Sequence, residues 1–155
     1  MLMGAFAGVF GSVFGERPVL AASKASDSAW NLSDDAWRER LTAEAYNVLR
    51  NEGTERPFTS SLNDEKRSGN YHCAGCDQPL FSSQAKFDSG TGWPSFFQPL
   101  EAGIATKVDF KLIIPRTEYH CSRCGGHQGH VFNDGPRPTG KRYCNNGVAL
   151  RFQPA

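Results

Sequence analysis

Apolar residues recur every three or four positions between residues 33 and 53, which predicts an amphipathic helix. Ser33 suits the N-cap of this helix, and the acidic side chains of Asp34 and Asp35 suit its positive end. Gly53 suits its C-terminal end. The apolar residues that share one face are Trp37, Leu41, Ala45, Val48 and Leu49. We expect this helix to pack on one end of a sheet and to take no part in chemistry.

Two later stretches alternate between apolar and other residues with the period of a β-strand. The apolar positions are Val108, Phe110, Leu112 and Ile114 in the first stretch and Val148, Leu150 and Phe152 in the second. Turn sequences rich in glycine, proline and aspartate lie at residues 88–90, 133–136 and 138–140. Short strands joined by such turns predict a mainly β fold of antiparallel strands.

The chain has 155 residues, of which 39% are hydrophobic and 21% charged, and this suits a single globular domain. We expect the domain to cover residues 33–155, after a linker at residues 22–32. Residues 1–21 predict a signal or leader segment, because they begin with an apolar run and end in small residues. The segment lacks the usual basic start and is too short for a permanent membrane span. We therefore expect an exported, periplasmic protein, with a cytoplasmic location as the alternative.

Charge adds little to this picture. Lys and Arg total 17 and Asp and Glu total 16, so the formal net charge is +1. Basic runs are absent from the sequence, which argues against nucleic acid or an acidic membrane as a partner. We expect a monomer.

The five cysteines divide into two pairs and a single residue. Cys73 and Cys76 form one Cys-x-x-Cys, Cys121 and Cys124 form another, and Cys144 stands alone. Each pair lies in a similar hexapeptide that begins Tyr-His-Cys and ends in Cys. Four thiolates from two such turns match the tetrahedral ligand set of one structural zinc ion. With four protein ligands, such an ion stabilises a fold and does not activate water.

The paired cysteines have three alternative interpretations. An iron or iron–sulfur centre uses the same ligands, and the sequence alone does not exclude it. A thioredoxin-like redox pair needs a βαβ context, which neither pair has. Two disulfides within the pairs would close only short loops and stabilise little. We favour structural zinc over all three.

Cys144 is a candidate nucleophile. It lies just before the second alternating stretch, and Arg142 and Asn146 are each two residues away. In a strand the three side chains point to one face, where the guanidinium favours the thiolate and the amide offers a hydrogen-bond donor. The alternative is a small buried apolar residue, as most lone cysteines are. The polar neighbours argue against it.

His127 and His130 can supply the acid–base chemistry that a thiol enzyme needs. They follow the second cysteine pair, so a metal there would hold their loop rigid. The alternatives are a second metal site and plain surface histidines. A separate glycine-rich segment contributes Trp93, with Phe96 or Phe97, as walls of an apolar pocket, although such aromatic residues more often belong to a core.

Four motifs stand in one order along the chain. They are the paired Cys-x-x-Cys turns, Gly92-Trp93-Pro94-Ser95-Phe96, Gly129-His130-Val131-Phe132 and Arg142-Tyr143-Cys144-x-Asn146. Together they resemble the methionine sulfoxide reductase B family, and the resemblance covers residues 33–153. It implies a tent-like fold of two antiparallel sheets, with one structural zinc ion on the four paired cysteines.

The resemblance also implies an enzyme, a peptide-methionine (R)-S-oxide reductase. Such an enzyme reduces the R epimer of methionine sulfoxide, free or in proteins, and so repairs oxidised proteins. Cys144 would attack the sulfoxide sulfur, release methionine and become a sulfenic acid. Trp93 would pack on the substrate's methyl group, with Phe96 and Phe132 as further substrate-binding residues. The remaining implied residues are His127, His130 and Asn146 around the sulfoxide oxygen and Arg142 near the thiolate.

One position departs from the commonest pattern of the family. Many members have a cysteine directly before the Gly-Trp-Pro-Ser-Phe run, which resolves the sulfenic acid as an internal disulfide. Here that residue is Thr91, and the sequence has no sixth cysteine to replace it. We therefore expect a one-cysteine cycle. An external thiol, either thioredoxin or glutathione with glutaredoxin, would attack the Cys144 sulfenic acid directly.

Two other functions compete with this one. A non-enzymatic zinc module that binds a protein partner explains the cysteine pairs, but it leaves Cys144 and its polar neighbours unexplained. A cysteine hydrolase with a dyad of Cys144 and His130 gives no reason for the Gly-Trp-Pro-Ser-Phe run.

Overall fold

A computed structural model describes residues 29–155. The predicted leader at residues 1–21 and most of the predicted linker lie outside the described residues. Within the part of the chain that is described, no helix is both long enough and apolar enough to cross a membrane.

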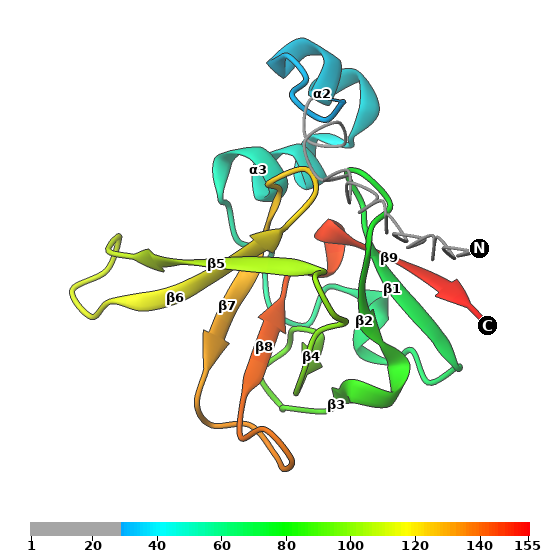
Figure 1. Ribbon diagram of the computed structural model, residues 1–155, viewed down its shortest axis with the longest axis vertical. Helices are drawn as coiled ribbons and strands as arrows, with labels where there is room; N and C mark the ends of the chain where they lie inside the picture. Colours follow the sequence, from blue (N-terminus) through cyan, green and yellow to red (C-terminus); the bar gives the residue numbers. More distant parts are fainter. Residues whose placement is uncertain (1–28) are drawn as a thin grey trace, which may run out of the picture.

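Two short helices precede the sheets (Figure 1). α2 spans Asp34–Arg40 and α3 spans Ala43–Asn51. Ser33 caps α2 as predicted, because its side chain accepts a hydrogen bond from the backbone N–H of Ala36 at 3.3 Å. The buried residues of the two helices are Trp37, Ala45, Tyr46, Val48 and Leu49.

The prediction of a single helix is wrong at its middle and at its end. The side chain of Thr42 caps a second helix by accepting a hydrogen bond from the N–H of Ala45 at 3.1 Å, and Leu41 before it is extended. A Thr that bonds to its own backbone in this way competes with a continuous helix. Glu52, and not Gly53, takes the left-handed position after α3, with φ of 54°.

The strands form two antiparallel sheets, which confirms the predicted mainly β fold (Figure 1). The smaller sheet has the order β2-β1-β9 and consists of β1 (Gly69–Cys73), β2 (Pro79–Ser82) and β9 (Leu150–Pro154). The larger sheet has the order β3-β4-β8-β7-β6-β5 and consists of β3 (Lys86–Phe87), β4 (Ser95–Phe96), β5 (Ile104–Asp109), β6 (Arg116–Cys121), β7 (His127–Phe132) and β8 (Arg142–Asn145). Short 3-10 helices are η1 (Ser61–Asn63), η2 (Ser83–Ala85) and η3 (Gly147–Ala149). Of the second alternating stretch, Val148 lies in η3, and Leu150 and Phe152 lie in β9.

An aromatic core joins the two sheets. Phe81 of the smaller sheet stacks on Phe96 of the larger sheet, with ring centroids 4.2 Å apart. Tyr71 meets Phe96 edge-on at 4.9 Å, and Tyr119 meets Phe81 in the same manner at 6.0 Å. All four side chains are fully buried. Because aromatic pairs of this kind are among the strongest apolar contacts, they fix the strands that carry the candidate site.

The alternating stretch at residues 107–114 is not one strand. β5 ends at Asp109, whose side chain accepts a hydrogen bond from the N–H of Lys111 at 2.8 Å and so closes a turn. The apolar side chains of this stretch are exposed: Val108 by 56%, Phe110 by 74%, Leu112 by 57% and Ile114 by 76%. Figure 1 shows the reason, since the β5–β6 hairpin projects as an arm away from the rest of the chain. Within residues 29–155, no second layer covers the end of this arm.

Candidate active site and metal centre

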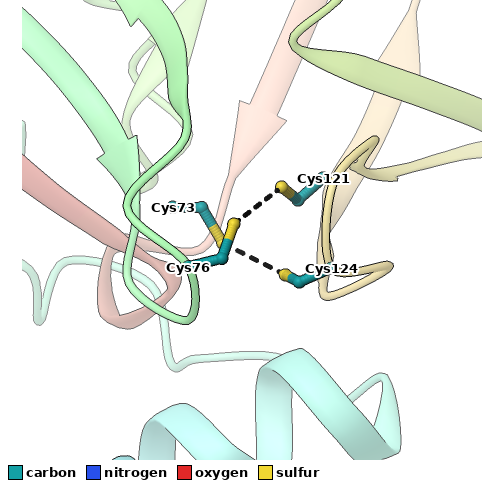
Figure 2. A group of neighbouring side chains, drawn as sticks. All are labelled: Cys73, Cys76, Cys121 and Cys124. Carbon is teal, nitrogen blue, oxygen red and sulfur yellow. Dashed lines mark hydrogen bonds between the residues drawn. The ribbon is translucent and has the colours of Figure 1, made fainter. Parts of the chain in front are cut away.

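The four paired cysteines form one cluster between the two sheets. β1 of the smaller sheet ends at Cys73 and β6 of the larger sheet ends at Cys121, so a turn with a second cysteine follows each strand. Figure 2 shows Cys73 and Cys76 on one side facing Cys121 and Cys124 on the other. Their sulfur atoms all lie within 4.8 Å of one another, and all four residues are buried.

Both Cys-x-x-Cys turns have the same backbone form. The N–H of Asp77 donates to the carbonyl of Cys73, and the N–H of Gly125 donates to the carbonyl of Cys121, each at 2.9 Å. Asp77 and Gly125 both have positive φ, 65° and 70°, which glycine adopts without strain. The sequence repeat is therefore a structural repeat.

The geometry of the cluster fits a tetrahedral metal ion. The sulfur atoms of Cys73 and Cys124 are 3.6 Å apart, and those of Cys76 and Cys121 are 3.4 Å apart. A zinc ion with four bonds of about 2.3 Å needs sulfur atoms about 3.8 Å apart, so a small outward movement would admit it. None of the cysteines is in a disulfide, which argues against the disulfide interpretation.

Cys144 lies on β8, between β4 and β7 of the larger sheet. In the strand register Ser95 of β4 is its partner on one side and His130 of β7 on the other. Directly paired residues of antiparallel strands place their side chains on the same face, so the structure brings the two predicted groups together. Gly129 permits this close pairing, because a Cβ at that position would lie 1.8 Å from the carbonyl oxygen of Cys144.

Cys144 opens into a small pocket of about 110 Å³. This volume suits the end of one side chain and is well below that of a typical cofactor site. The lining residues are Thr54, Trp93, Arg116, Gly129, His130, Phe132, Cys144, Asn145 and Asn146. A larger cavity of about 790 Å³ lies between α3, residues 54–67 and β9, and it contains no predicted site residue.

His130 belongs to a chain of polar groups. Its Nε2 lies 2.8 Å from Oδ2 of Asp109, and the same oxygen accepts a hydrogen bond from Nη2 of Arg116 at 2.8 Å. The backbone N–H of Lys111, then His130 and Arg116, hold the pKa of Asp109 well below its usual range. Burial lowers the pKa of His130, so its ring is neutral near pH 7 and donates to the ionised Asp109.

Arg116 lines the pocket and carries a hydrogen-bond donor without a partner. Its Nε is buried and has no hydrogen-bond partner within residues 29–155. A buried polar atom without a partner costs about 1–3 kcal/mol, so native proteins rarely keep one without a purpose.

His127 is buried behind His130 and does not line the pocket. It is 3% exposed, its Nδ1 lies 2.7 Å from Oε1 of Glu118, and its ring lies 5.5 Å from the ring of His130. Burial raises the pKa of Glu118, but hydrogen bonds from His120 and His127 outweigh this and lower it to about 2. The anionic Glu118 therefore fixes His127, which acts through its neighbour as a positioning residue.

Arg142 pairs with the carboxylate of Asp134 and lies over an aromatic ring. Its guanidinium donates two hydrogen bonds to Asp134, at 2.9 and 3.0 Å, and lies 4.3 Å over the ring of Phe132. Burial raises the pKa of the Cys144 thiol, whereas the charge of Arg142 and hydrogen bonds from Thr91 and Arg142 lower it. Arg142 thus acts in the predicted direction but does not overcome burial. The resting group is a thiol at neutral pH.

Trp93 and Asn146 are both held by the backbone of Glu55. Nε1 of Trp93 donates to the carbonyl of Glu55 at 2.9 Å, and the N–H of Glu55 donates to Oδ1 of Asn146 at 2.9 Å. Nδ2 of Asn146 donates to the carbonyl of Gln128 at 2.8 Å. Both polar atoms of this amide therefore have backbone partners, and Nδ2 carries a second N–H that these two bonds leave unused.

The prediction that Phe96 binds substrate is wrong. Phe96 is 0% exposed and stacks on Phe81 in the core. Successive side chains of a strand point to opposite faces. Since Ser95 pairs with Cys144 on the site face, Phe96 must point to the core face.

Gln128 connects the four-cysteine cluster to the strand that carries Cys144. Its Nε2 donates to the sulfur of Cys73 at 3.4 Å, and its Oε1 accepts a hydrogen bond from Nδ2 of Asn145 at 3.1 Å. Oδ1 of Asn145 accepts a hydrogen bond from the Tyr119 hydroxyl at 2.6 Å. Gln128, Asn145 and Tyr119 are completely buried, so the network is shielded from water.

Sequence reasoning missed several residues of the site. They are Thr54, Glu55, Asp109, Arg116, Glu118 and Gln128. A weak signal was present for Arg116 and Glu118, since they lie two apart in a strand and so share a face. Thr54 and Glu55 carry no such signal, because they lie in an irregular segment after α3.

The arrangement is that of a thiol-dependent active site beside a structural metal centre. The SelR domain matches residues 41–154 of the chain. The chain is 54% identical over 125 residues to the peptide methionine sulfoxide reductase MsrB of Agrobacterium fabrum, which covers 80% of this chain and 93% of that protein. It is 53% identical over 124 residues to the enzyme of the same name from Leptospira interrogans, covering 79% and 95%. This chain belongs to the methionine sulfoxide reductase B family.

Some relatives are longer. The chain is 52% identical over 124 residues to the chloroplastic peptide methionine sulfoxide reductase B1 of Oryza sativa, which covers 79% of this chain and 58% of that protein. The protein of the same name from Arabidopsis thaliana is covered to 61%. The chain thus spans less than two thirds of the length of these two relatives.

Proposed function

We propose that this protein reduces the R epimer of methionine sulfoxide to methionine, free or in proteins, and so repairs oxidised proteins. The observation that carries the proposal is the half-buried thiol of Cys144 in a pocket with an aromatic wall and an unused donor on Arg116. The names of the relatives, which are peptide methionine sulfoxide reductases, support it.

The residues around the space in front of the thiol supply apolar walls and a hydrogen-bond donor. Trp93 and Phe132 supply apolar walls for the methyl group, and Nε of Arg116 supplies a donor for the oxygen. The sulfur of the substrate then faces Cys144. Because a sulfoxide sulfur is a stereocentre, a pocket that distinguishes methyl from oxygen accepts one epimer.

The reaction moves two electrons from one sulfur to the other. A hydrogen bond or a proton on the sulfoxide oxygen makes the substrate sulfur electrophilic, and His130 is placed to pass the thiol proton of Cys144 to that oxygen. The thiolate then forms a bond to the substrate sulfur and gives a sulfurane-like intermediate. Its collapse forms a bond from the oxygen to the sulfur of Cys144 as the bond between the two sulfurs and the bond from the substrate sulfur to the oxygen break. Methionine leaves, and the oxygen stays on Cys144 as a sulfenic acid.

The sulfenic acid requires a thiol from outside the chain. Thr91 lies near Cys144, lowers the pKa of its thiol, and offers a hydroxyl and no thiol. The other four cysteines are buried together in the metal cluster. One external thiol would release water and form a mixed disulfide, and a second would free Cys144. We propose thioredoxin, or glutathione with glutaredoxin, as the source.

We propose zinc as the metal of the four-cysteine cluster. The donor set of four buried sulfur atoms suits that ion. Bound there, zinc would cross-link the two sheets. It would take no part in the reaction, because all four coordination positions would belong to the protein.

A stereospecific assay tests the proposed function. The protein is incubated with both sulfur epimers of dabsyl-methionine sulfoxide and dithiothreitol, and the epimers are separated by chromatography. We expect loss of the R epimer alone, and no turnover by Cys144→Ser. Turnover that survives Cys144→Ser, or loss of the S epimer, would defeat the assignment. No turnover by folded wild-type protein would favour a non-enzymatic metal module.

A further inference from the structure

The end of the β5–β6 arm carries an apolar surface that the fold does not cover. We call residues 108–114 the arm tip. Its exposed apolar side chains are Val108 (56%), Phe110 (74%), Leu112 (57%), Ile113 (101%) and Ile114 (76%). Single exposed apolar residues are common, but a group of this size on one short segment marks an interaction site.

The charges of the arm are paired within the molecule. Lys107 and Lys111 both bind Glu52, the latter at 2.6 Å. Arg116 binds Asp109 at 2.8 Å. Residues 104–116 contain no other charged side chain. Three cations thus face two anions, a net charge of +1, and each lies in an ion pair. The arm tip therefore complements an uncharged apolar partner better than an acidic membrane or a charged protein.

The base of the arm is also a wall of the catalytic pocket. Arg116 lines the pocket, and Asp109 binds the pocket residue His130. Phe110 directly follows Asp109, and Ile114 comes two residues before Arg116. Since consecutive Cα atoms are about 3.8 Å apart, the arm tip begins within one or two residues of the pocket wall on both strands.

A polypeptide whose side chain enters this pocket must pass beside the arm. An extended chain advances about 3.3 Å per residue, so residues within about four positions of the bound side chain can reach the arm tip. A second exposed aromatic residue, Phe58 (73%), lies near another wall, because its N–H donates to the carbonyl of Gly92 at 2.7 Å, next to Trp93. Apolar surface thus continues outward from the pocket.

We propose that the arm tip binds apolar residues that flank the oxidised methionine in an unfolded polypeptide substrate. This inference rests on the proposed function and names the substrate class of the same site. Apolar residues around a methionine are buried in folded proteins and accessible in unfolded ones. The arm therefore favours oxidised, unfolded polypeptides over free methionine sulfoxide.

A triple variant, Phe110→Ser with Leu112→Ser and Ile113→Ser, tests the inference. These side chains are exposed, so the fold does not depend on them. Three substrates are compared: N-acetyl-methionine sulfoxide, a peptide with leucine and valine on both sides of methionine sulfoxide, and the same peptide with serine and glycine. The control variant is Gln84→Ser with Gln153→Ser, two exposed changes at and near the smaller sheet.

We expect the wild type to have about a tenfold lower KM for the apolar peptide than for the polar peptide, as burial of one or two side chains allows. The triple variant should lose this preference and keep its kinetics on the other two substrates, and the control should match the wild type.

Equal KM values for both peptides in the wild type, or a loss of activity by the triple variant on all substrates, would overturn the inference. So would a dimer in sedimentation velocity, or binding to acidic lipid vesicles, that only the triple variant loses. A wild type inactive on every sulfoxide would instead defeat the proposed function.

Discussion

The indole N–H of Trp93 donates a hydrogen bond to the backbone carbonyl of Glu55, with 2.9 Å between nitrogen and oxygen. The carboxylate of Glu55 also accepts a hydrogen bond from the N–H of Gly147 at 2.5 Å. Glu55 therefore joins the aromatic wall of the pocket to the start of η3, which follows β8. The orientation of Trp93 depends on this bond as well as on packing.

Replacing Trp93→Phe should weaken substrate binding moderately. The variant keeps an aromatic ring and loses the donor to Glu55. A hydrogen bond contributes about 0.5–1.5 kcal/mol, so KM should rise about two- to tenfold with little change in kcat. Steady-state kinetics with both substrate epimers checks this. The matched control is Glu55→Gln, which keeps the carbonyl and should bind substrate like the wild type. An unchanged KM in Trp93→Phe would show that the bond does not orient the ring.

Replacing Asp134→Asn should make Cys144 more acidic. Asp134 pairs with Arg142 and its charge raises the pKa of the thiol, whereas Arg142 lowers it. Removing the carboxylate therefore leaves the full charge of Arg142 to stabilise the thiolate. Alkylation by iodoacetamide at pH 7 should become about three- to tenfold faster, as a shift of up to one pKa unit implies.

The opposite change provides the control for Asp134→Asn. Arg142→Met should raise the pKa of Cys144 and move the alkylation profile to higher pH. Rates measured from pH 6 to 10 give the pKa directly. If both variants moved the profile in the same direction, the electrostatic account of this pair would be incorrect.

Replacing Thr91→Cys should create an internal resolving thiol. Thr91 lies close enough to Cys144 to lower the pKa of its thiol, so we expect a cysteine there to reach it. After one turnover with methionine sulfoxide and no reductant, this variant should form a disulfide between residues 91 and 144. The wild type should instead yield a dimedone adduct on Cys144, and Thr91→Ser should behave like the wild type. Mass spectrometry distinguishes the products. A wild-type disulfide between Cys144 and a cluster cysteine would disprove the one-cysteine cycle.

Replacing Arg116→Lys should impair turnover without weakening the binding of the product. Lysine can still pair with Asp109, but it lacks the Nε that has no partner in the described structure. A hydrogen bond from a charged donor contributes about 1.5–3 kcal/mol, so kcat/KM should fall about ten- to 150-fold. Methionine has no sulfoxide oxygen, and its inhibition constant should therefore stay unchanged. Equal losses for substrate and product would indicate a structural defect.

Removal of the metal should destabilise the whole domain. The cluster joins the ends of β1 and β6, which belong to different sheets. We expect a strong chelator, or the change Cys76→Ser, to lower the thermal midpoint by more than about 10 °C. Cys144 lies outside the cluster, so Cys144→Ser should keep the thermal midpoint within about 2 °C of the wild-type value. Calorimetry with metal analysis checks both, with about one zinc per chain expected.

The parts of the site that the sequence predicted are those with local spacing. The two Cys-x-x-Cys turns place their ligands by turn geometry alone, and strand alternation places Arg142 and Cys144 on one face. The pairing of Cys144 with His130 needed the strand register, and the bond from Trp93 to Glu55 joins segments 38 residues apart. No local pattern contains such contacts.

Two predictions were wrong because an apolar pattern does not say what will cover it. Alternation at residues 107–114 predicted a strand, but β5 ends at Asp109 and the apolar side chains of the stretch stay exposed. Phe96 was assigned to the pocket from its motif, although the pleat turns it into the core. In both cases the pattern itself is present in the sequence. The packing of the surrounding layers determines which of its side chains are buried.

In the proposed one-cysteine cycle, a hydroxyl instead of a thiol at Thr91 would set the working lifetime of the protein. A sulfenic acid with no thiol beside it persists until an external thiol reaches it, and during that wait an oxidant can convert it to sulfinic acid, which does not return to the thiol. Inactivation per cycle should then depend on the ratio of thiol to peroxide in the surroundings. Under severe oxidation this protein would be consumed along with the damage that it repairs.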